Sequence, residues 1–176
     1  MFRNMAASML RTARFDEKAV GAPKVKDRVI TTITKAKQLR PFIEKLITLA
    51  KHAAPHQASA GEFATQHPHH TAEWKAWRKS DAWQKWNQAT APHVALRRRA
   101  FALLRDKEAV KILFEVIGPR FADRNGGYTR IVRLPKPRLG DAGTRAFIEF
   151  VGDPTHDRSK KRRAAPAVVA SAAAPN

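Results

Sequence analysis

The stretch from Gly118 to Ile131, GPRFADRNGGYTRI, separates two parts of the chain that have different patterns. Before it, apolar residues recur every three or four positions, as in helices, and after it apolar and polar residues alternate, as in strands. Gly118 follows an apolar run that ends at Ile117, so we expect it to end a helix in a left-handed conformation, with Pro119 preventing continuation. The stretch therefore predicts a change from helix to sheet.

The same stretch gathers groups that suit a polyanion. Asn125, Gly126 and Gly127 tolerate positive φ, and the two glycines allow bare backbone to approach a flat or charged surface. Arginine side chains pair with phosphate oxygens, and a neighbouring aromatic ring can stack on a base. The alternative is a solvated loop whose aromatic ring packs into the core. The side chains around the turn are Arg120, Arg124, Tyr128 and Arg130, with Asp123 as the single acid.

The charge of the chain points to the same kind of partner. The 176 residues include 34 basic and 15 acidic side chains, for a formal net charge of +19. A compact domain with this charge repels itself unless a polyanion neutralises it, and nucleic acid is the expected polyanion. A membrane surface competes as a partner, but no apolar run approaches the roughly 20 residues needed to span a bilayer.

The patterns predict an α+β fold in which helices pack on one face of a small mixed sheet of about three strands. Period-two alternation with a short intervening loop predicts an antiparallel pair from the last two strands. The apolar side of the first helix should face the sheet, and Asp106 should cap the last helix. We expect helices over residues 2–14, 35–51, 94–104 and 107–117, strands over residues 29–32, 128–134 and 145–151, and a break at residues 21–23.

Residues 53–93 form a distinct segment that contains all four tryptophans. Its first part, residues 53–70, is rich in alanine, histidine and small polar residues and should be loop. Its second part repeats a Trp-x-x-Trp pattern after nine residues, which would place the two pairs on opposite faces of one helix. We therefore expect a second short helix capped by Ser80 or Asp81. The tryptophans form either a small satellite core or a contact with RNA or a neighbouring protein.

No catalytic, cofactor or metal site is expected. The chain has no cysteine, which excludes disulfides, zinc ribbons and thiol catalysis. The glycine turn matches neither a dinucleotide-binding motif nor a P-loop, and no serine sits in a nucleophile elbow. His67, His69 and His70 are close in sequence but lack the spacing of a zinc enzyme.

The turn stretch resembles the signature of the bacterial large-subunit ribosomal protein seventeen family. Four other segments resemble that family in the same order, so the resemblance covers residues 1–151 apart from an insertion at about 53–93. The segments are MFRNMAASMLR (1–11), ITTITKAKQLRPFIEKLITLAK (30–51), RRRAFALLRDKEAVKILF (97–114) and AFIEFV (146–151). Residues 152–176 would form a basic tail rich in alanine and proline, which we expect to be disordered.

The resemblance implies a structural constituent of the large ribosomal subunit that binds its RNA by arginine and lysine contacts to phosphate. It further implies a place near the peptide exit tunnel, beside large-subunit proteins thirty-two and twenty-two, in a cytoplasmic ribosome. The family usually carries a basic arm before the position of Met1, and the basic, amphipathic start also fits a transit peptide to an organellar ribosome. The candidate RNA-binding residues that the resemblance implies are Arg120, Arg124, Gly126, Gly127, Tyr128, Arg130, Arg3, Lys35, Lys37 and Arg40.

The basic triplet Arg97, Arg98 and Arg99 is a further candidate, because three adjacent arginines cannot all point inward. Two other functions remain open at this point. One is an architectural DNA-binding protein, although no helix-turn-helix spacing or intercalating ribbon is evident. The other is an RNA-modifying enzyme in which Asp106, Glu108 and Asp123 would meet.

Overall fold

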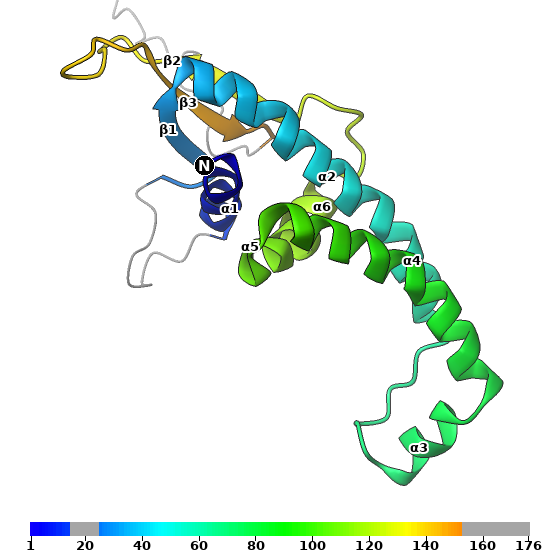
Figure 1. The fold of residues 1–176 in the computed structure, drawn as a ribbon. Helices are drawn as coiled ribbons and strands as arrows, with labels where there is room; N and C mark the ends of the chain where they lie inside the picture. Colours follow the sequence, from blue (N-terminus) through cyan, green and yellow to red (C-terminus); the bar gives the residue numbers. More distant parts are fainter. Residues whose placement is uncertain (15–24, 153–176) are drawn as a thin grey trace, which may run out of the picture.

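The computed structural model describes residues 1–14 and 25–152 (Figure 1). The expected break at residues 21–23 and, beyond Gly152, the expected tail lie outside the described residues. The elements in chain order are α1 (Phe2–Ala13), β1 (Arg28–Thr32), α2 (Ile33–Gly61), α3 (Ala72–Arg78), α4 (Asp81–Leu104), α5 (Lys107–Ile112), the π-helical turn η1 (Leu113–Ile117), α6 (Gly118–Arg120), β2 (Thr129–Arg133) and β3 (Arg145–Phe150).

The three strands form one sheet in the order β1-β3-β2, and this arrangement confirms the predicted α+β class. The pairing of β2 with β3 is antiparallel, as predicted from the short connection between them. β1 pairs with the opposite edge of β3, also antiparallel, so the sheet is antiparallel throughout rather than mixed. The last strand of the sequence is therefore the central strand, which the local pattern could not indicate.

The hydrophobic core lies between the sheet and the helices that cover one of its faces. Ile148 of β3 is fully buried with Met9 and Leu10 of α1, Leu46 of α2 and Leu113 of η1. The apolar side of α1 faces this core, as the amphipathic pattern predicts. Asp106 caps α5 by accepting a hydrogen bond of 3.1 Å from the Ala109 amide, which confirms the predicted cap.

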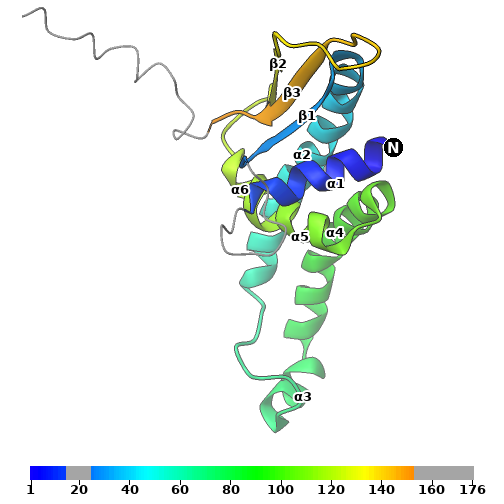
Figure 2. The same cartoon turned by 90° about the vertical axis from the view of Figure 1, so that its left-hand side faces the viewer.

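The helices α2 and α4 run together away from this core and hold α3 at their far end (Figures 1 and 2). α2 is a continuous helix of 29 residues that ends at Gly61, so the loop predicted for residues 53–70 is wrong in its first part. Ala53 and Ala60 are buried, and Nδ1 of His93 on α4 lies 3.3 Å from the Ala53 carbonyl oxygen. Packing against α4 therefore overrides the small and polar composition of this segment.

The Trp-rich segment forms two helices, as predicted from its repeat, and Ser80 occupies the N-cap position of the second, although its side chain makes no capping hydrogen bond. The second helix is not short, however. α4 continues without interruption from Asp81 to Leu104 and contains Pro92, so the helix predicted at residues 94–104 is its C-terminal part.

Gly118 does not end a helix in the left-handed region. Its φ is −55°, and the chain continues through η1 into α6, where Pro119 occupies the first turn that tolerates proline. The reason for glycine here is space, because a Cβ at Gly118 would lie 3.3 Å from the Ala50 Cβ. The backbone reverses further on, where Gly126 and Gly127 have φ values of +104° and +59°.

Candidate nucleic-acid interface

The turn between α6 and β2 is fixed by side chains from the turn and from α2. Nε of Arg124 donates a hydrogen bond of 3.2 Å to the Gly126 carbonyl oxygen. Nζ of Lys51 on α2 donates to the Arg124 carbonyl oxygen at 2.5 Å. Sequence reasoning missed this role of Lys51, because nothing local to α2 shows that the turn will pass beside it.

The Tyr128 side chain packs into the core, which was the alternative to a ring that faces RNA. Its side chain is 5% exposed, and its ring packs against Phe121 with 5.2 Å between the ring centroids. The Tyr128 hydroxyl lies 3.4 Å from Nζ of Lys51. The ring is therefore not positioned to stack on a base, and the expectation of an RNA-facing tyrosine is corrected. The aromatic neighbours Phe121 and Phe150, which come together only in the fold, account for the burial.

Arg120 is held by an ion pair rather than directed outward. Nη1 of Arg120 lies 2.8 Å from Oδ2 of Asp27, which precedes β1 and is buried. This contact joins α6 to the start of β1 across 93 positions of sequence. We missed Asp27, because its φ of +59° and its burial both follow from tertiary structure.

Arg130 shares the buried carboxylate of Glu149 with Arg28. Arg130 donates from Nε to Oε1 at 2.8 Å and also from Nη2, while Arg28 donates from Nε and Nη2 to Oε2 at 3.0 and 2.6 Å. Burial alone would raise the pKa of Glu149, but the hydrogen bonds and charges of Arg130 and Arg28 outweigh it, so the pKa lies below its ordinary value. Two cations and one anion therefore leave this cluster with a net positive charge, and the Arg130 side chain stays 56% exposed.

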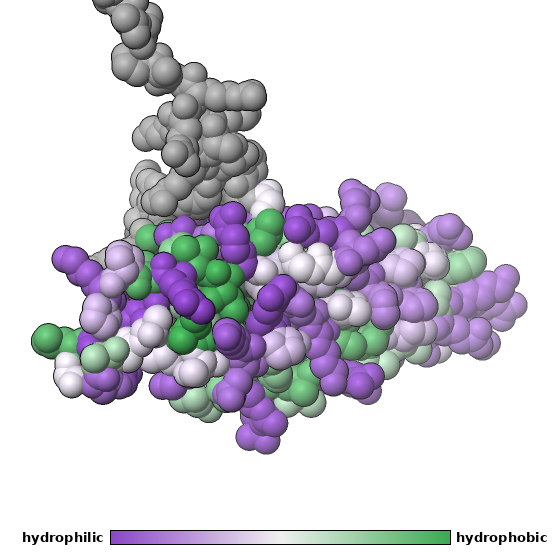
Figure 3. All heavy atoms as spheres, turned by 90° about the horizontal axis from the view of Figure 1, so that it is seen from above, coloured by the Kyte–Doolittle hydropathy of each residue, from purple (hydrophilic) through white to green (hydrophobic). Residues whose placement is uncertain are grey.

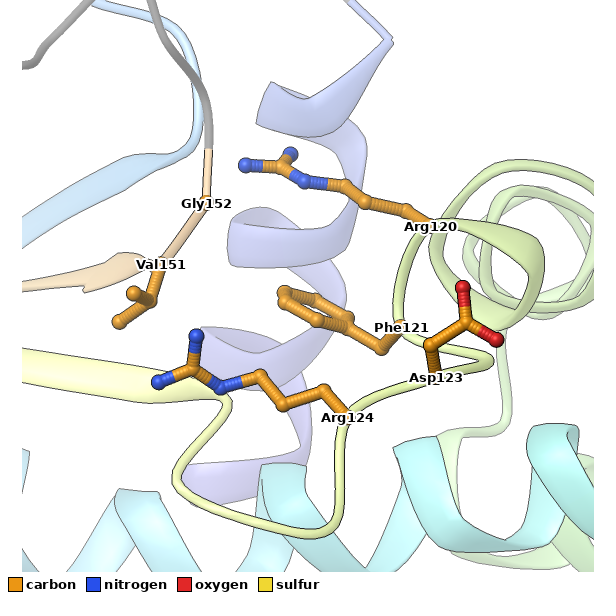
Figure 4. Close-up of a pocket in the computed structure, with 6 residues that line it drawn as sticks. All are labelled: Arg120, Phe121, Asp123, Arg124, Val151 and Gly152. Atoms are coloured by element: carbon orange, nitrogen blue, oxygen red, sulfur yellow. The ribbon is translucent and has the colours of Figure 1, made fainter.

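A surface cavity of about 270 Å³ lies beside the turn. Figure 4 shows Arg120 and Arg124 on either side of the Phe121 ring, with both guanidinium groups directed toward the side of Val151 and Gly152. The carboxylate of Asp123 lies on the other side of the ring. The guanidinium of Arg124 can bind an anion in this cavity, whereas that of Arg120 is bonded to the Asp27 carboxylate.

The remaining predicted cations come from three helices and do not form one cluster. Arg3 lies on α1, Lys35, Lys37 and Arg40 lie near the start of α2, and the triplet at residues 97–99 lies on α4. All are exposed except Lys35, which is half-buried. Arg40 pairs with Glu44 at 3.3 Å. Within the described residues, no carboxylate lies within ion-pair distance of Arg3, Lys35, Lys37, Arg97, Arg98, Arg99 or Arg124.

The described part of the chain offers little support for metal binding, membrane insertion or acid catalysis. Residues 1–14 and 25–152 contain no group of three or more histidine, aspartate or glutamate side chains that could hold a metal ion. None of the helices described has the length and apolarity to cross a membrane. Asp106 and Glu108 come together at Arg11, with which both pair, but within the described residues Asp123 does not join them in a group of three acids that could hold a metal ion.

The fold and the charge together define a class, that of small basic α+β proteins whose unpaired cations lie on several surface elements. Comparison with known proteins identifies the family within this class. A sequence profile described as ribosomal protein L17 matches residues 1–151. The chain belongs to the ribosomal protein L17 family.

Three relatives illustrate the similarity, and each carries the name large ribosomal subunit protein bL17. The protein of Rhodopirellula baltica is 49% identical over 152 residues, which cover 86% of this chain and 72% of the relative. The protein of Solibacter usitatus is 34% identical over 166 residues, which cover 92% of this chain and 75% of the relative. The protein of a Hydrogenobaculum species is 39% identical over 125 residues, which cover 71% of this chain and 73% of the relative. The predicted resemblance is confirmed, and the chain is a structural protein of the ribosome rather than an enzyme.

Proposed function

We propose that this protein is a structural constituent of the large ribosomal subunit that binds ribosomal RNA through phosphate contacts from arginine and lysine. The observation that carries the proposal is the set of exposed or half-buried cations with no carboxylate partner in the described chain, on a member of a ribosomal family. Such cations displace the counterions condensed on RNA, and this release drives binding. Their spread over α1, α2, α4 and the turn allows one body to bridge RNA segments that otherwise repel.

The predicted RNA-binding residues divide into two groups by their contacts. Arg124 and the triplet at residues 97–99 have no carboxylate partner in the described chain, so they can bind phosphate directly. Arg120 and Arg130 are ion-paired, and their main role is to fix the scaffold that presents the others. Gly126 and Gly127 contribute the bend that brings Arg124 to the surface.

The finer location is part of the same proposal. By family resemblance, the protein lies near the peptide exit tunnel and contacts large-subunit proteins thirty-two and twenty-two. The basic surface supports an RNA-lined position, and the exposed part of the tryptophan cluster at residues 74–86 offers a surface for a neighbouring protein. Cross-linking of assembled subunits followed by mass spectrometry would test these neighbours.

Gel-shift titrations test the RNA assignment. The purified protein is mixed with a transcribed fragment of large-subunit RNA or with duplex DNA of the same length, at matched salt. We expect tighter binding to the RNA fragment and the presence of the protein in purified large subunits. Preference for duplex DNA would contradict the proposal and favour an architectural DNA-binding protein.

A further inference from the structure

The face of the sheet opposite the core carries an apolar row that crosses all three strands. Ala146, Ile148 and Phe150 of β3 point to the core, so Phe147 points to the other face. In the strand register, Phe147 pairs with Ile30 of β1 on one side and with Val132 of β2 on the other. Ile30 is 54% exposed, and Phe147 and Val132 are half-buried. Figure 3 shows hydrophobic residues gathered near the sheet end of the molecule, with hydrophilic residues around them.

Two arginines, Arg28 on β1 and Arg130 on β2, flank one side of this row. Glu149 holds Arg28 and Arg130 through Nε and Nη2 of each, so Nη1 of each guanidinium is left to bind an outside acceptor. The guanidinium of Arg28 also lies over the Phe147 ring, 3.9 Å from its centroid. Glu149 therefore holds both planar cations in fixed positions, and that of Arg28 lies against the apolar row.

A basic pocket of about 280 Å³ borders the row on its other side, next to Ile30. Ile30 belongs to both, so the two surfaces are continuous. No acidic side chain lines this pocket. One of its cations, Arg138, pairs with Asp141 outside the pocket. The side-chain hydrogen bond from Arg138 lowers the pKa of Asp141 to about 2. The residues that line it are Ile30, Thr31, Thr32, Lys35, Arg138 and Arg145.

We propose that this sheet face binds an unpaired RNA nucleotide, with its base on the row formed by Ile30, Phe147 and Val132 and its phosphate in the pocket beside Lys35 and Arg145. The charges around the row favour a phosphate over an apolar or basic partner. The row spans two inter-strand spacings of about 4.8 Å each, which matches the size of a base. A base in a duplex is covered by its neighbours, so only an unpaired nucleotide can use both the row and the pocket. The inference rests on the proposed RNA-binding function. It adds that the RNA is unpaired at the contact and that the contact lies on the outer face of the sheet.

Fluorescence anisotropy with two labelled RNAs tests the inference, one a single-stranded oligonucleotide of mixed sequence and the other a fully paired hairpin. The Ile30→Ser/Val132→Ser variant makes both ends of the apolar row polar while leaving Phe147 and the cations in place. We expect its affinity for the single strand to fall about tenfold, the range of one stacked base, with little change for the hairpin. The matched control is Val116→Ser, since Val116 is exposed on η1, away from the sheet. Unchanged binding to both RNAs, or equal losses for both, would overturn the inference.

A second measurement covers the case in which the double variant folds poorly. RNA carrying 4-thiouridine is cross-linked to the unmodified protein, and the attached peptides are identified by mass spectrometry. We expect cross-links within residues 28–32 and 145–150, whereas cross-links confined to other segments would overturn the inference. If the unmodified protein fails to bind large-subunit RNA at all, the proposed function fails as well. If RNA binding survives but the variant loses a neighbouring ribosomal protein, the face is a protein-docking surface instead.

Discussion

The molecule has two regions that are held together in different ways. The body, comprising residues 1–14, 25–52 and 94–152, buries large side chains such as Leu39, Leu113 and Ile148 completely. The arm, residues 53–93, has no buried residue in α3, and its buried residues are Ala53, Ala60 and His93. The body therefore has a hydrophobic core of its own, whereas the arm depends on contact between two helices and a small aromatic cluster.

The tryptophans at the end of the arm pack together, but none of them is fully buried. The rings of Trp77 and Trp86 meet edge to face with 5.7 Å between centroids, and Nε1 of Trp77 donates to the Phe63 carbonyl oxygen at 3.3 Å. Trp74 packs against His69 and His70, and all four tryptophans remain half-buried. The expected satellite core is thus present as a partly exposed cluster, which leaves surface for a partner.

The largest expected contrast between the two regions is in the cost of truncating a buried side chain. Leu113→Ala in the body should lower the free energy of unfolding by about 3 kcal/mol, because a fully buried leucine leaves a cavity. Trp77→Ala in the arm should lower it by about 1 kcal/mol, because the indole is only half-buried and has few partners. Urea denaturation measures both values, and equal losses would mean that the arm is as tightly packed as the body.

The next effect concerns the charge cluster on the sheet. Glu149→Gln should lower the free energy of unfolding at neutral pH by about 2 kcal/mol, because Arg28 and Arg130 lose their shared anion. Since the pKa of Glu149 in the folded protein lies below its ordinary value of 4.5, its contribution is present above that pH and is lost as the pH falls further. The unfolding curves of the unmodified protein and the variant should therefore differ at pH 7 and approach each other as the pH falls below 4.5. A difference in the free energy of unfolding that stays constant with pH would contradict the role given to the ionised Glu149 side chain.

The smallest effect compares two glycines, one in each region, at which an added Cβ would meet open space. Gly126→Ala in the body should cost about 1 kcal/mol, because its φ of +104° is strained for any residue with a Cβ. Gly61→Ala in the arm should have no cost or a slight stabilising effect, since it lies in a helix with open space around it. Thermal unfolding of the two variants measures the difference. A loss at Gly61 as large as at Gly126 would show that the end of α2 is not helical in solution.

The local parts of the fold were predictable from the sequence, and the long-range parts were not. The strands, α1 and the Asp106 cap follow from alternation, amphipathic spacing and capping chemistry, which are properties of neighbouring residues. The central position of β3 and the helical course of α2 beyond His52 depend on contacts with distant segments. The same holds for the site, where exposed arginines were predictable from charge. The burial of Tyr128 and the partners Asp27 and Glu149 were not, because they come from strands and loops far along the chain.

The salt dependence of RNA binding tests most directly whether the unpaired cations of the body bind ribosomal RNA. The dissociation constant for a large-subunit RNA fragment is measured between 50 and 200 mM salt for three proteins: the unmodified chain, the body variant Arg97→Ala/Arg98→Ala/Arg99→Ala, and the arm variant Lys75→Ala/Arg78→Ala/Lys79→Ala. The two variants remove the same charge from the two regions. We expect the body variant to bind more weakly and its salt slope to fall by about 1 per lost phosphate contact, with the arm variant close to the unmodified protein. Identical affinities and slopes for the body variant and the unmodified protein would contradict the account.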